Sequence, residues 1–163
     1  MNKMRRFFRK LSFPTASEVA AKANESLPPF LGSAFNRKLL FVEDDLEIRM
    51  VMREIIKKYA CEMVEAADGK AALIHFEPRK YDLILLDVRL PDMSGIEILR
   101  TIRWQDPLQP VAVFSGYLDS ATIDEIYAAG WAFLGRKPDD LRDGNVLRLM
   151  LRTAGIIPKP EFL

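Results

Sequence analysis

Short apolar runs alternate with helix-like stretches from Lys38 to Gly155, and this alternation is the strongest constraint on the fold. The run at 83–86 is continuously apolar, which is typical of a parallel strand covered on both faces. Strands that alternate with helices predict an α/β fold, a five-stranded parallel sheet doubly wound by its crossover helices. The expected strands are 39–42, 61–65, 81–86, 110–114 and 131–134, and the expected helices are about 45–59, 69–77, 94–104, 119–129 and 140–154.

Charge and turn-forming residues divide the chain. Residues 1–38 hold eight Lys/Arg and two Glu (+6), whereas residues 39–163 hold sixteen Lys/Arg and twenty-one Asp/Glu (−5). With the prolines of the front segment, this shift predicts an extension and linker at 1–36, a domain at 37–155 and a tail at 156–163. A lone cysteine, Cys61, and the absence of an apolar run near the ~20 residues of a membrane span favour a cytoplasmic protein.

Carboxylates follow two of the expected strands. Glu43 and Asp44 follow the first strand, and Asp87 follows the third. In a doubly wound sheet of order 2-1-3-4-5 these strands are neighbours at the switch point, where ligands bind beyond the carboxyl ends. Three close carboxylates repel one another unless one is protonated or a cation lies among them. The pattern therefore predicts a cation site for Mg²⁺, which prefers oxygen ligands and phosphate.

A hydroxyl and an ammonium follow the remaining strands of the same edge. Ser115 follows the fourth expected strand and precedes Gly116, and Lys137 comes after the fifth. Together with the carboxylates they form the parts of a phosphoryl site, in which Asp87 attacks phosphorus, cations neutralise the oxygens and a hydroxyl donates to one of them. A glycine at 116 would allow a phosphoryl group to approach the backbone closely.

In these motifs the chain resembles the response regulator receiver family of two-component signalling. The likeness is carried by residues 39–45 (LLFVEDD) and 83–95 (LILLDVRLPDMSG), and by the pairs Ser115-Gly116, Ala129-Gly130 and Lys137-Pro138. It implies a flavodoxin-like (βα)5 receiver fold. It also implies a phosphorelay function, in which a sensor histidine kinase or phosphotransfer protein donates a phosphoryl group to an aspartate with Mg²⁺.

The resemblance assigns a role to each motif residue. Asp87 is implied as the phosphoacceptor, Ser115 as the switch hydroxyl and Lys137 as the cationic partner. The implied metal ligands are Asp44 and Asp87 directly, Glu43 through water, and the backbone carbonyl of Arg89.

Two positions depart from the family pattern. Leu134 occupies the place of the switch aromatic, while Phe133 is expected on the other face of the strand. Trp131 occupies a place that usually holds a small residue. These departures leave open an alternative function as a receiver-like interaction module without phosphorylation. A phosphatase-like hydrolase is disfavoured, because Arg89 stands where that chemistry wants a second acid, and we expect no turnover enzyme.

The front segment predicts a second kind of contact. In residues 1–11 the apolar side chains share one helical arc and the basic ones share the other. Such a helix can lie on an anionic membrane, dock in a partner's groove or pack on the domain itself, and the sequence leaves these open. We expect no direct nucleic-acid contact, because no DNA-binding motif is present. Only residues 156–163 follow the last expected helix, so we expect output through a downstream protein target.

Overall fold

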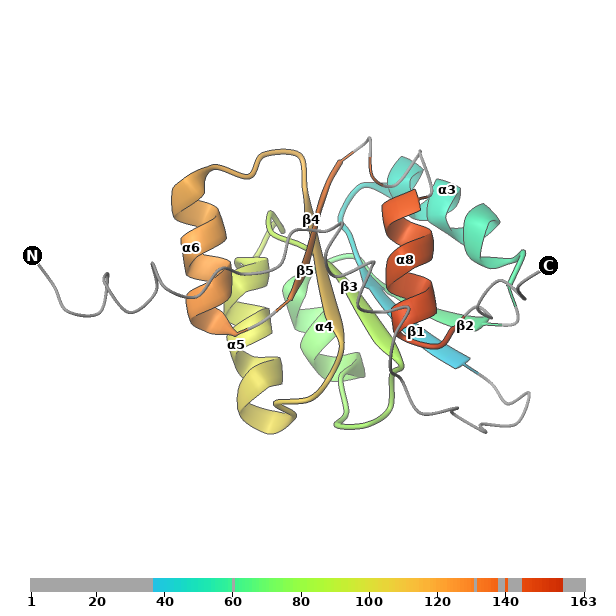
Figure 1. The fold of residues 1–163 in the computed structure, drawn as a ribbon, viewed down its shortest axis with the longest axis horizontal. Helices are drawn as coiled ribbons and strands as arrows, with labels where there is room; N and C mark the ends of the chain where they lie inside the picture. Colours follow the sequence, from blue (N-terminus) through green and yellow to red (C-terminus); the bar gives the residue numbers. More distant parts are fainter. Residues whose placement is uncertain (1–36, 60, 131, 138–139, 141–144, 157–163) are drawn as a thin grey trace, which may run out of the picture. The chain divides into compact units, whose positions relative to one another are not determined.

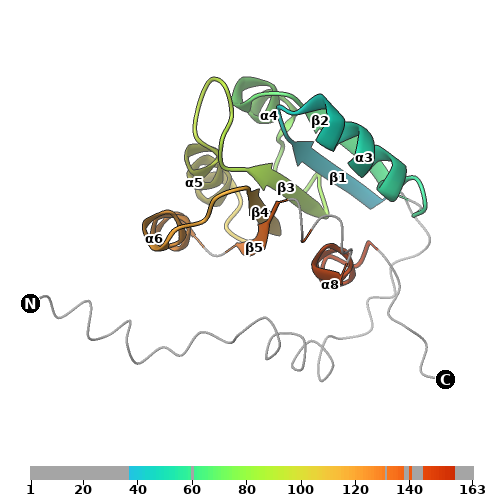
Figure 2. The same cartoon turned by 90° about the horizontal axis from the view of Figure 1, so that it is seen from above.

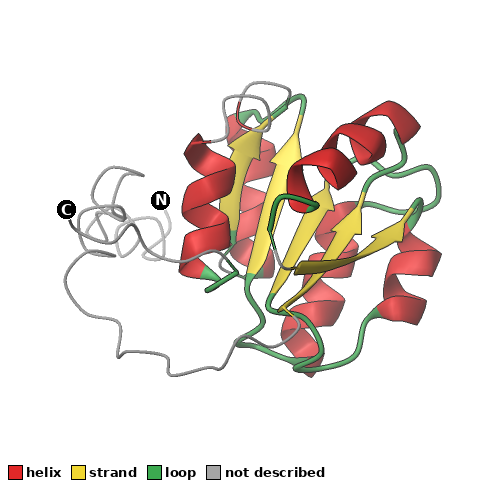
Figure 3. Ribbon diagram, turned by 90° about the vertical axis from the view of Figure 1, so that its right-hand side faces the viewer, coloured by secondary structure: helices red, strands yellow, loops and turns green. Residues whose placement is uncertain are grey.

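Five parallel strands form one twisted sheet in the computed structural model, which describes residues 37–59, 61–130, 132–137, 140 and 145–156 (Figures 1 and 3). The strand order is β2-β1-β3-β4-β5, as the sequence predicts. The strands are β1 (Arg37–Val42), β2 (Cys61–Ala66), β3 (Leu83–Asp87), β4 (Val111–Ser115) and β5 (Phe133–Arg136). The extension at 1–36, Trp131, Pro138 and the tail from 157 lie outside the described residues.

Helices cover both faces of this sheet. The helices are α3 (Leu46–Ile56), α4 (Gly69–His75), α5 (Gly95–Gln105), α6 (Ser120–Ala129) and α8 (Asn145–Thr153). Helices α4, α5 and α6 lie on one face, and α3 and α8 lie on the other (Figure 2). The predicted doubly wound α/β fold is therefore confirmed. Within the described residues, no helix combines the length and the apolar character needed to cross a bilayer.

The apolar strands explain this double covering. In β3, Ile84 and Leu86 pack toward α4, α5 and α6, whereas Leu83 and Leu85 pack toward α3 and α8. All four side chains are at most 1% exposed. A strand buried on both faces needs apolar residues at every position, which is why this run does not alternate.

Side-chain caps start the helices at the carboxyl edge of the sheet. Asp45, Asp68, Ser94 and Asp119 each accept a hydrogen bond from a backbone N–H in the first turn of α3, α4, α5 and α6. These caps satisfy N–H groups that have no partner within the helix. Each cap also fixes the residue at which the preceding loop ends and the helix begins. The polar motifs of the sequence lie in these loops.

The fifth strand begins two residues later than predicted, at Phe133 rather than at 131. Phe133 packs toward α3 and α8 and Leu134 toward α4, α5 and α6, so the expectation of opposite faces is confirmed. A Cβ at Gly135 would lie 2.3 Å from the Phe114 ring. Only a residue without a side chain lets β5 pack against that ring. Lys137 is the first residue after β5 and lies at the carboxyl edge of the sheet.

Candidate functional site

Three carboxylates meet where β1 and β3 end. Val42 pairs with Leu86 across these neighbouring strands, so the residues that follow them lie side by side. One carboxylate oxygen from each of Glu43, Asp44 and Asp87 lies within 4.8 Å of the others. Glu43 is 1% exposed and Asp87 is 6% exposed, whereas Asp44 is exposed. The cluster is therefore buried on one side and open to solvent at Asp44.

The ammonium of Lys137 enters this cluster from β5. Its Nζ contacts Oε2 of Glu43 and lies 2.7 Å from Oδ2 of Asp87. Its backbone N–H donates to the carbonyl of Ser115 at 3.0 Å, which ties the residue to the end of β4. A cation that is only 10% exposed, between two buried carboxylates, offsets much of their mutual repulsion.

Burial dominates the protonation of Glu43. Removal of its carboxylate from water raises the pKa of Glu43, and the negative charge of Asp87 adds to the rise. The hydrogen bond and the charge of Lys137 act in the opposite direction. Three carboxylates face the single ammonium of Lys137, and oxygen donors of this kind fit a hard divalent cation such as Mg²⁺.

Ser115 reaches the predicted edge, but its hydroxyl is bound within its own loop. The Oγ donates to the carbonyl of Tyr117 at 2.9 Å and accepts from the Tyr117 N–H at 3.3 Å. The side chain is fully buried. A new hydrogen bond from this hydroxyl to a group on Asp87 would break its bond to the Tyr117 carbonyl, and its switch role remains a prediction.

A tight turn carries Arg89 past the site. Arg89 forms an isolated bridge with Ser94, and the N–H of Gly95 donates to the carbonyl of Val88 at 2.9 Å. A Cβ at Gly95 would lie 2.0 Å from the carbonyl oxygen of Asp87, so α5 can begin there only with a glycine. This turn fixes the backbone of residue 89 two residues after Asp87, while its role as a metal ligand stays a prediction.

Sequence reasoning missed Arg49. One guanidinium nitrogen of this α3 residue donates to the backbone carbonyls of Glu43 at 2.6 Å and Asp44 at 2.8 Å. Arg49 lies one helical turn after the cap residue Asp45, a spacing from which a long side chain can reach back to the preceding loop. That spacing was the available signal.

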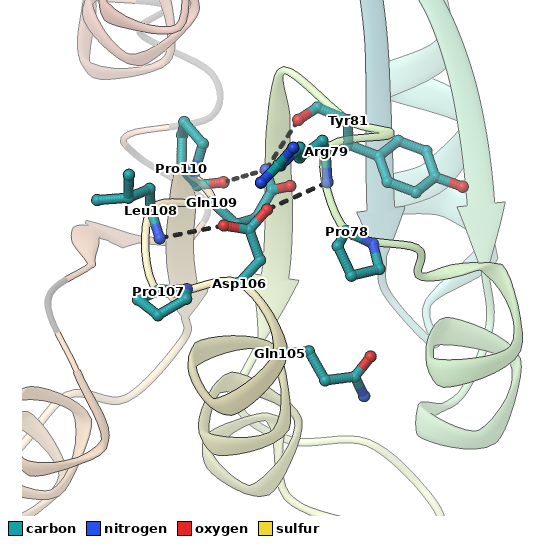
Figure 4. A pocket seen from close by; sticks show the side chains of 9 residues that line it. All are labelled: Pro78, Arg79, Tyr81, Gln105, Asp106, Pro107, Leu108, Gln109 and Pro110. Atoms are coloured by element: carbon teal, nitrogen blue, oxygen red, sulfur yellow. Dashed lines mark hydrogen bonds between the residues drawn. The ribbon is translucent and has the colours of Figure 1, made fainter.

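A cavity lies away from these groups. Its volume is about 740 Å³ and it is found where β3 and β4 begin, lined by residues 78–79, 81 and 105–110 (Figure 4). There the buried amide nitrogen of Gln109 donates to the carbonyls of Tyr81 and Pro110. None of the predicted site residues lines this cavity. The carboxylates, Ser115 and Lys137 lie at the opposite edge of the sheet, where the strands end.

Comparisons with known proteins agree with this geometry. The family profile described as the response regulator receiver domain matches residues 39–143. Sporulation initiation phosphotransferase F of Bacillus subtilis is 33% identical over 121 residues, which cover 72% of this chain and 98% of the relative. A CheY-like receiver domain protein from Methanospirillum hungatei has a TM-score of 0.66 at 25% identity, covering 74% of this chain and 95% of that chain.

A further solved structure is the receiver domain of the sensor histidine kinase PA1611 from Pseudomonas aeruginosa, described with a magnesium ion coordinated in its active site cleft. It has a TM-score of 0.64 at 25% identity and covers 74% of this chain and 99% of that chain. The family profile spans well over half of the chain, and the strand order and fold agree with it. The chain therefore belongs to the response regulator receiver family.

Proposed function

We propose that this receiver takes a phosphoryl group on Asp87 from the phospho-His of a sensor histidine kinase or phosphotransfer protein, and that this modification switches a protein-binding surface. The observation that carries the proposal is the placement of Lys137 against Asp87 and Glu43, beside the exposed Asp44. A nucleophilic carboxylate, a fixed cation and an open acidic rim are the parts that phosphoryl transfer requires.

In the transfer step the carboxylate of Asp87 attacks the phosphorus of the phospho-His. A P–O bond to Asp87 forms as the P–N bond to the imidazole breaks, and the imidazole nitrogen keeps the electron pair of the broken bond. Lys137 already forms an ion pair with Oδ2 of Asp87, so it orients the nucleophile and stays beside the charge that arrives.

The acids of the cluster, with the carbonyl of Arg89, would hold Mg²⁺, which neutralises charge on the oxygens of the transferred group. In this proposal Glu43 has a different part from Asp44. Glu43 is buried and bound to Lys137, so it balances the site and acts through water, whereas Asp44 is exposed and free to be a direct ligand. Removal of either is expected to weaken cation binding.

The switch would use the end of β4. When a phosphoryl oxygen offers a new acceptor beside Asp87, the Ser115 hydroxyl can leave the Tyr117 carbonyl and donate to that oxygen instead. The loop that begins at Gly116 then has to rearrange, which shifts a two-state equilibrium. Because Leu134 replaces the aromatic of the family pattern, we propose that this rearrangement is transmitted through the β4–α6 loop rather than through an aromatic side chain.

The donor would dock beside the site on α3. Leu46, Met50 and Val51 on this helix are 57%, 52% and 53% exposed. An apolar helix face next to the carboxyl edge suits the apolar surface of a partner protein.

Phosphorylation with acetyl phosphate and Mg²⁺ tests the proposal. We expect an acid-stable, hydroxylamine-sensitive acyl phosphate in wild type and none in Asp87→Asn. The matched control is Asp45→Asn, because Asp45 is the next acid of the loop and asparagine caps a helix as well as aspartate does. No Mg²⁺-dependent modification of wild type would favour the interaction-module alternative, and steady turnover of phosphate esters would favour a hydrolase.

A further inference from the structure

We infer that Arg49 is a positioning residue for the cation site, and that it sets the Mg²⁺ affinity by holding the backbone of Glu43 and Asp44. This inference rests on the proposed function, since it concerns the same acids. Among the described residues, Arg49 forms no hydrogen bond or ion pair with the three carboxylates. It binds the backbone carbonyls of Glu43 and Asp44, the residues that carry two of them.

The loop geometry gives Arg49 this role. The N–H of Glu43 still belongs to the sheet, where it donates to Ala66 at 3.0 Å, and the carboxylate of Asp45 already caps α3. Between these anchors the chain turns from strand into helix through three consecutive acids. The two carbonyls of this turn, at Glu43 and Asp44, both accept from the same guanidinium nitrogen of Arg49.

The hold matters most for Asp44. Its side chain is exposed, and unlike Glu43 it has no recorded ion pair with Lys137 within the described residues. Its direction is therefore fixed through its backbone. A direct ligand that is free to rotate away costs ordering entropy when a cation binds, so a residue that restrains its backbone strengthens binding.

A second acid orients Arg49 in turn. The Nε of Arg49 lies 3.7 Å from Oε2 of Glu65 on β2, and Arg53, one turn further along α3, donates two hydrogen bonds to the Glu65 carboxylate at 2.8 and 2.9 Å. Glu65 thus faces both arginines, but only Arg49 reaches the loop. The side chain of Arg49 is 14% exposed, whereas that of Arg53 is 45% exposed.

Charge and positioning predict opposite results, which makes the inference testable. If Arg49 acted only through its positive charge, its removal would strengthen Mg²⁺ binding, because it repels a cation. If it acts by positioning, its removal weakens binding. Lysine at this position keeps the charge but lacks the planar fork that can face Glu65 while it binds the loop carbonyls.

The experiment is calorimetric titration of the full chain with Mg²⁺, for wild type, Arg49→Lys, Arg49→Gln and the control Arg53→Gln. We expect both Arg49 variants to bind Mg²⁺ about 10-fold more weakly or worse, and the control to bind like wild type. Thermal unfolding in EDTA reports whether each variant is folded. If the glutamine variant is unfolded there, the lysine variant decides.

Each outcome bears on one proposal. Unchanged or tighter binding in folded Arg49 variants overturns the positioning role and leaves the proposed function intact. Equal weakening in Arg53→Gln also overturns it, because that variant leaves the loop carbonyls untouched. Failure of the wild type to bind Mg²⁺ overturns the proposed function itself.

Discussion

The guanidinium carbon of Arg89 lies 5.6 Å from the centre of the Tyr117 ring. Arg89 follows Asp87 by two residues and Tyr117 follows Ser115 by two residues, so the contact joins the loops after β3 and β4 beside the acids. Both side chains are exposed, and a cation–π contact of this kind is worth about 0.5–1 kcal/mol. We expect the pair to act as a cover at the rim of the site, which screens a phosphoryl group on Asp87 from attacking water.

Loss of this cover is expected to shorten the lifetime of a phosphoryl group on Asp87. We predict that Arg89→Ala and Tyr117→Ala each speed hydrolysis about two- to five-fold, because water gains access. The double variant should be little faster than the quicker single variant, since the two side chains act as one cover. The rate of hydrolysis is measured as the loss of the phosphoryl group from Asp87 after the donor is removed. Tyr127→Ala on α6 is the control. Unchanged lifetimes in both single variants would contradict a screening role.

Asp44 is predicted to bind Mg²⁺ and to lower the stability of the metal-free protein. Asp44→Asn removes one of three carboxylates whose oxygens lie within 4.8 Å, so it should raise the melting temperature in EDTA. It should also abolish most of the stabilisation by Mg²⁺, which for a bound ligand is about 2.7 kcal/mol at 100 times Kd. Thermal unfolding with and without Mg²⁺ tests both effects, with Asp45→Asn as the control. Full Mg²⁺ stabilisation of Asp44→Asn would remove it from the ligand set.

The sequence located this edge because its signals are local and periodic. Continuous apolar runs indicate strands covered on both faces, and the end of each run places Glu43, Asp87, Ser115 and Lys137 at one edge once the strand order is assumed. The alternation of strands and helices predicts the doubly wound sheet, and the strand order 2-1-3-4-5 is the common order for a small sheet of this kind. Recognition of Asp87 and its neighbours as one cluster therefore needed no coordinates.

Other features depend on packing that a linear pattern does not record. The packing of β5 depends on the contact of Gly135 with the Phe114 ring, two residues that are distant in the sequence. The reach of Arg49 depends on its side-chain conformation, and the binding of the Ser115 hydroxyl to Tyr117 depends on the path of a loop. Each is a three-dimensional choice among conformations that the sequence pattern allows equally.

Gly95 is predicted to be intolerant of any side chain. Because a Cβ there would lie 2.0 Å from the Asp87 carbonyl oxygen, Gly95→Ala must displace backbone at the site. We expect a loss of about 1–3 kcal/mol in the free energy of unfolding, together with slower phosphorylation. Urea denaturation measures the first effect. Gly116→Ala is the matched control, since its Cβ would meet nothing within 4 Å, and its stability should change by less than about 0.5 kcal/mol.

Cys61 is predicted to be an unreactive thiol. Burial, aided by the charges of Asp82 and Glu62, raises the pKa of Cys61 from 9.0 to about 11. Below its pKa the thiolate fraction falls about tenfold for each pH unit, so at pH 8 the fraction at Cys61 is about 100-fold below that of an ordinary cysteine. Native protein should react with a thiol reagent at pH 8 at least that much more slowly than protein unfolded in urea. Equal rates would show that the thiol is accessible and open to oxidation.

The exposed face of α3 is predicted to recognise the phosphoryl donor. Met50→Asp and Val51→Asp place a charge on a surface that is already about half exposed, so the fold should tolerate them. If a phospho-His protein docks its own apolar surface there, transfer from that protein should slow about ten-fold or more. Phosphorylation by acetyl phosphate needs no docking and should keep its rate.

Ile74→Asp on α4 is the control for this prediction, because Ile74 is 79% exposed but belongs to a helix on the other face of the sheet. The two donors separate docking from chemistry. A variant that slows both has disturbed Asp87 or its cation, whereas one that slows only the protein donor has lost a contact. If Met50→Asp and Val51→Asp match wild type with both donors, the donor approaches the acids from another side, and the apolar residues of α3 have no part in transfer.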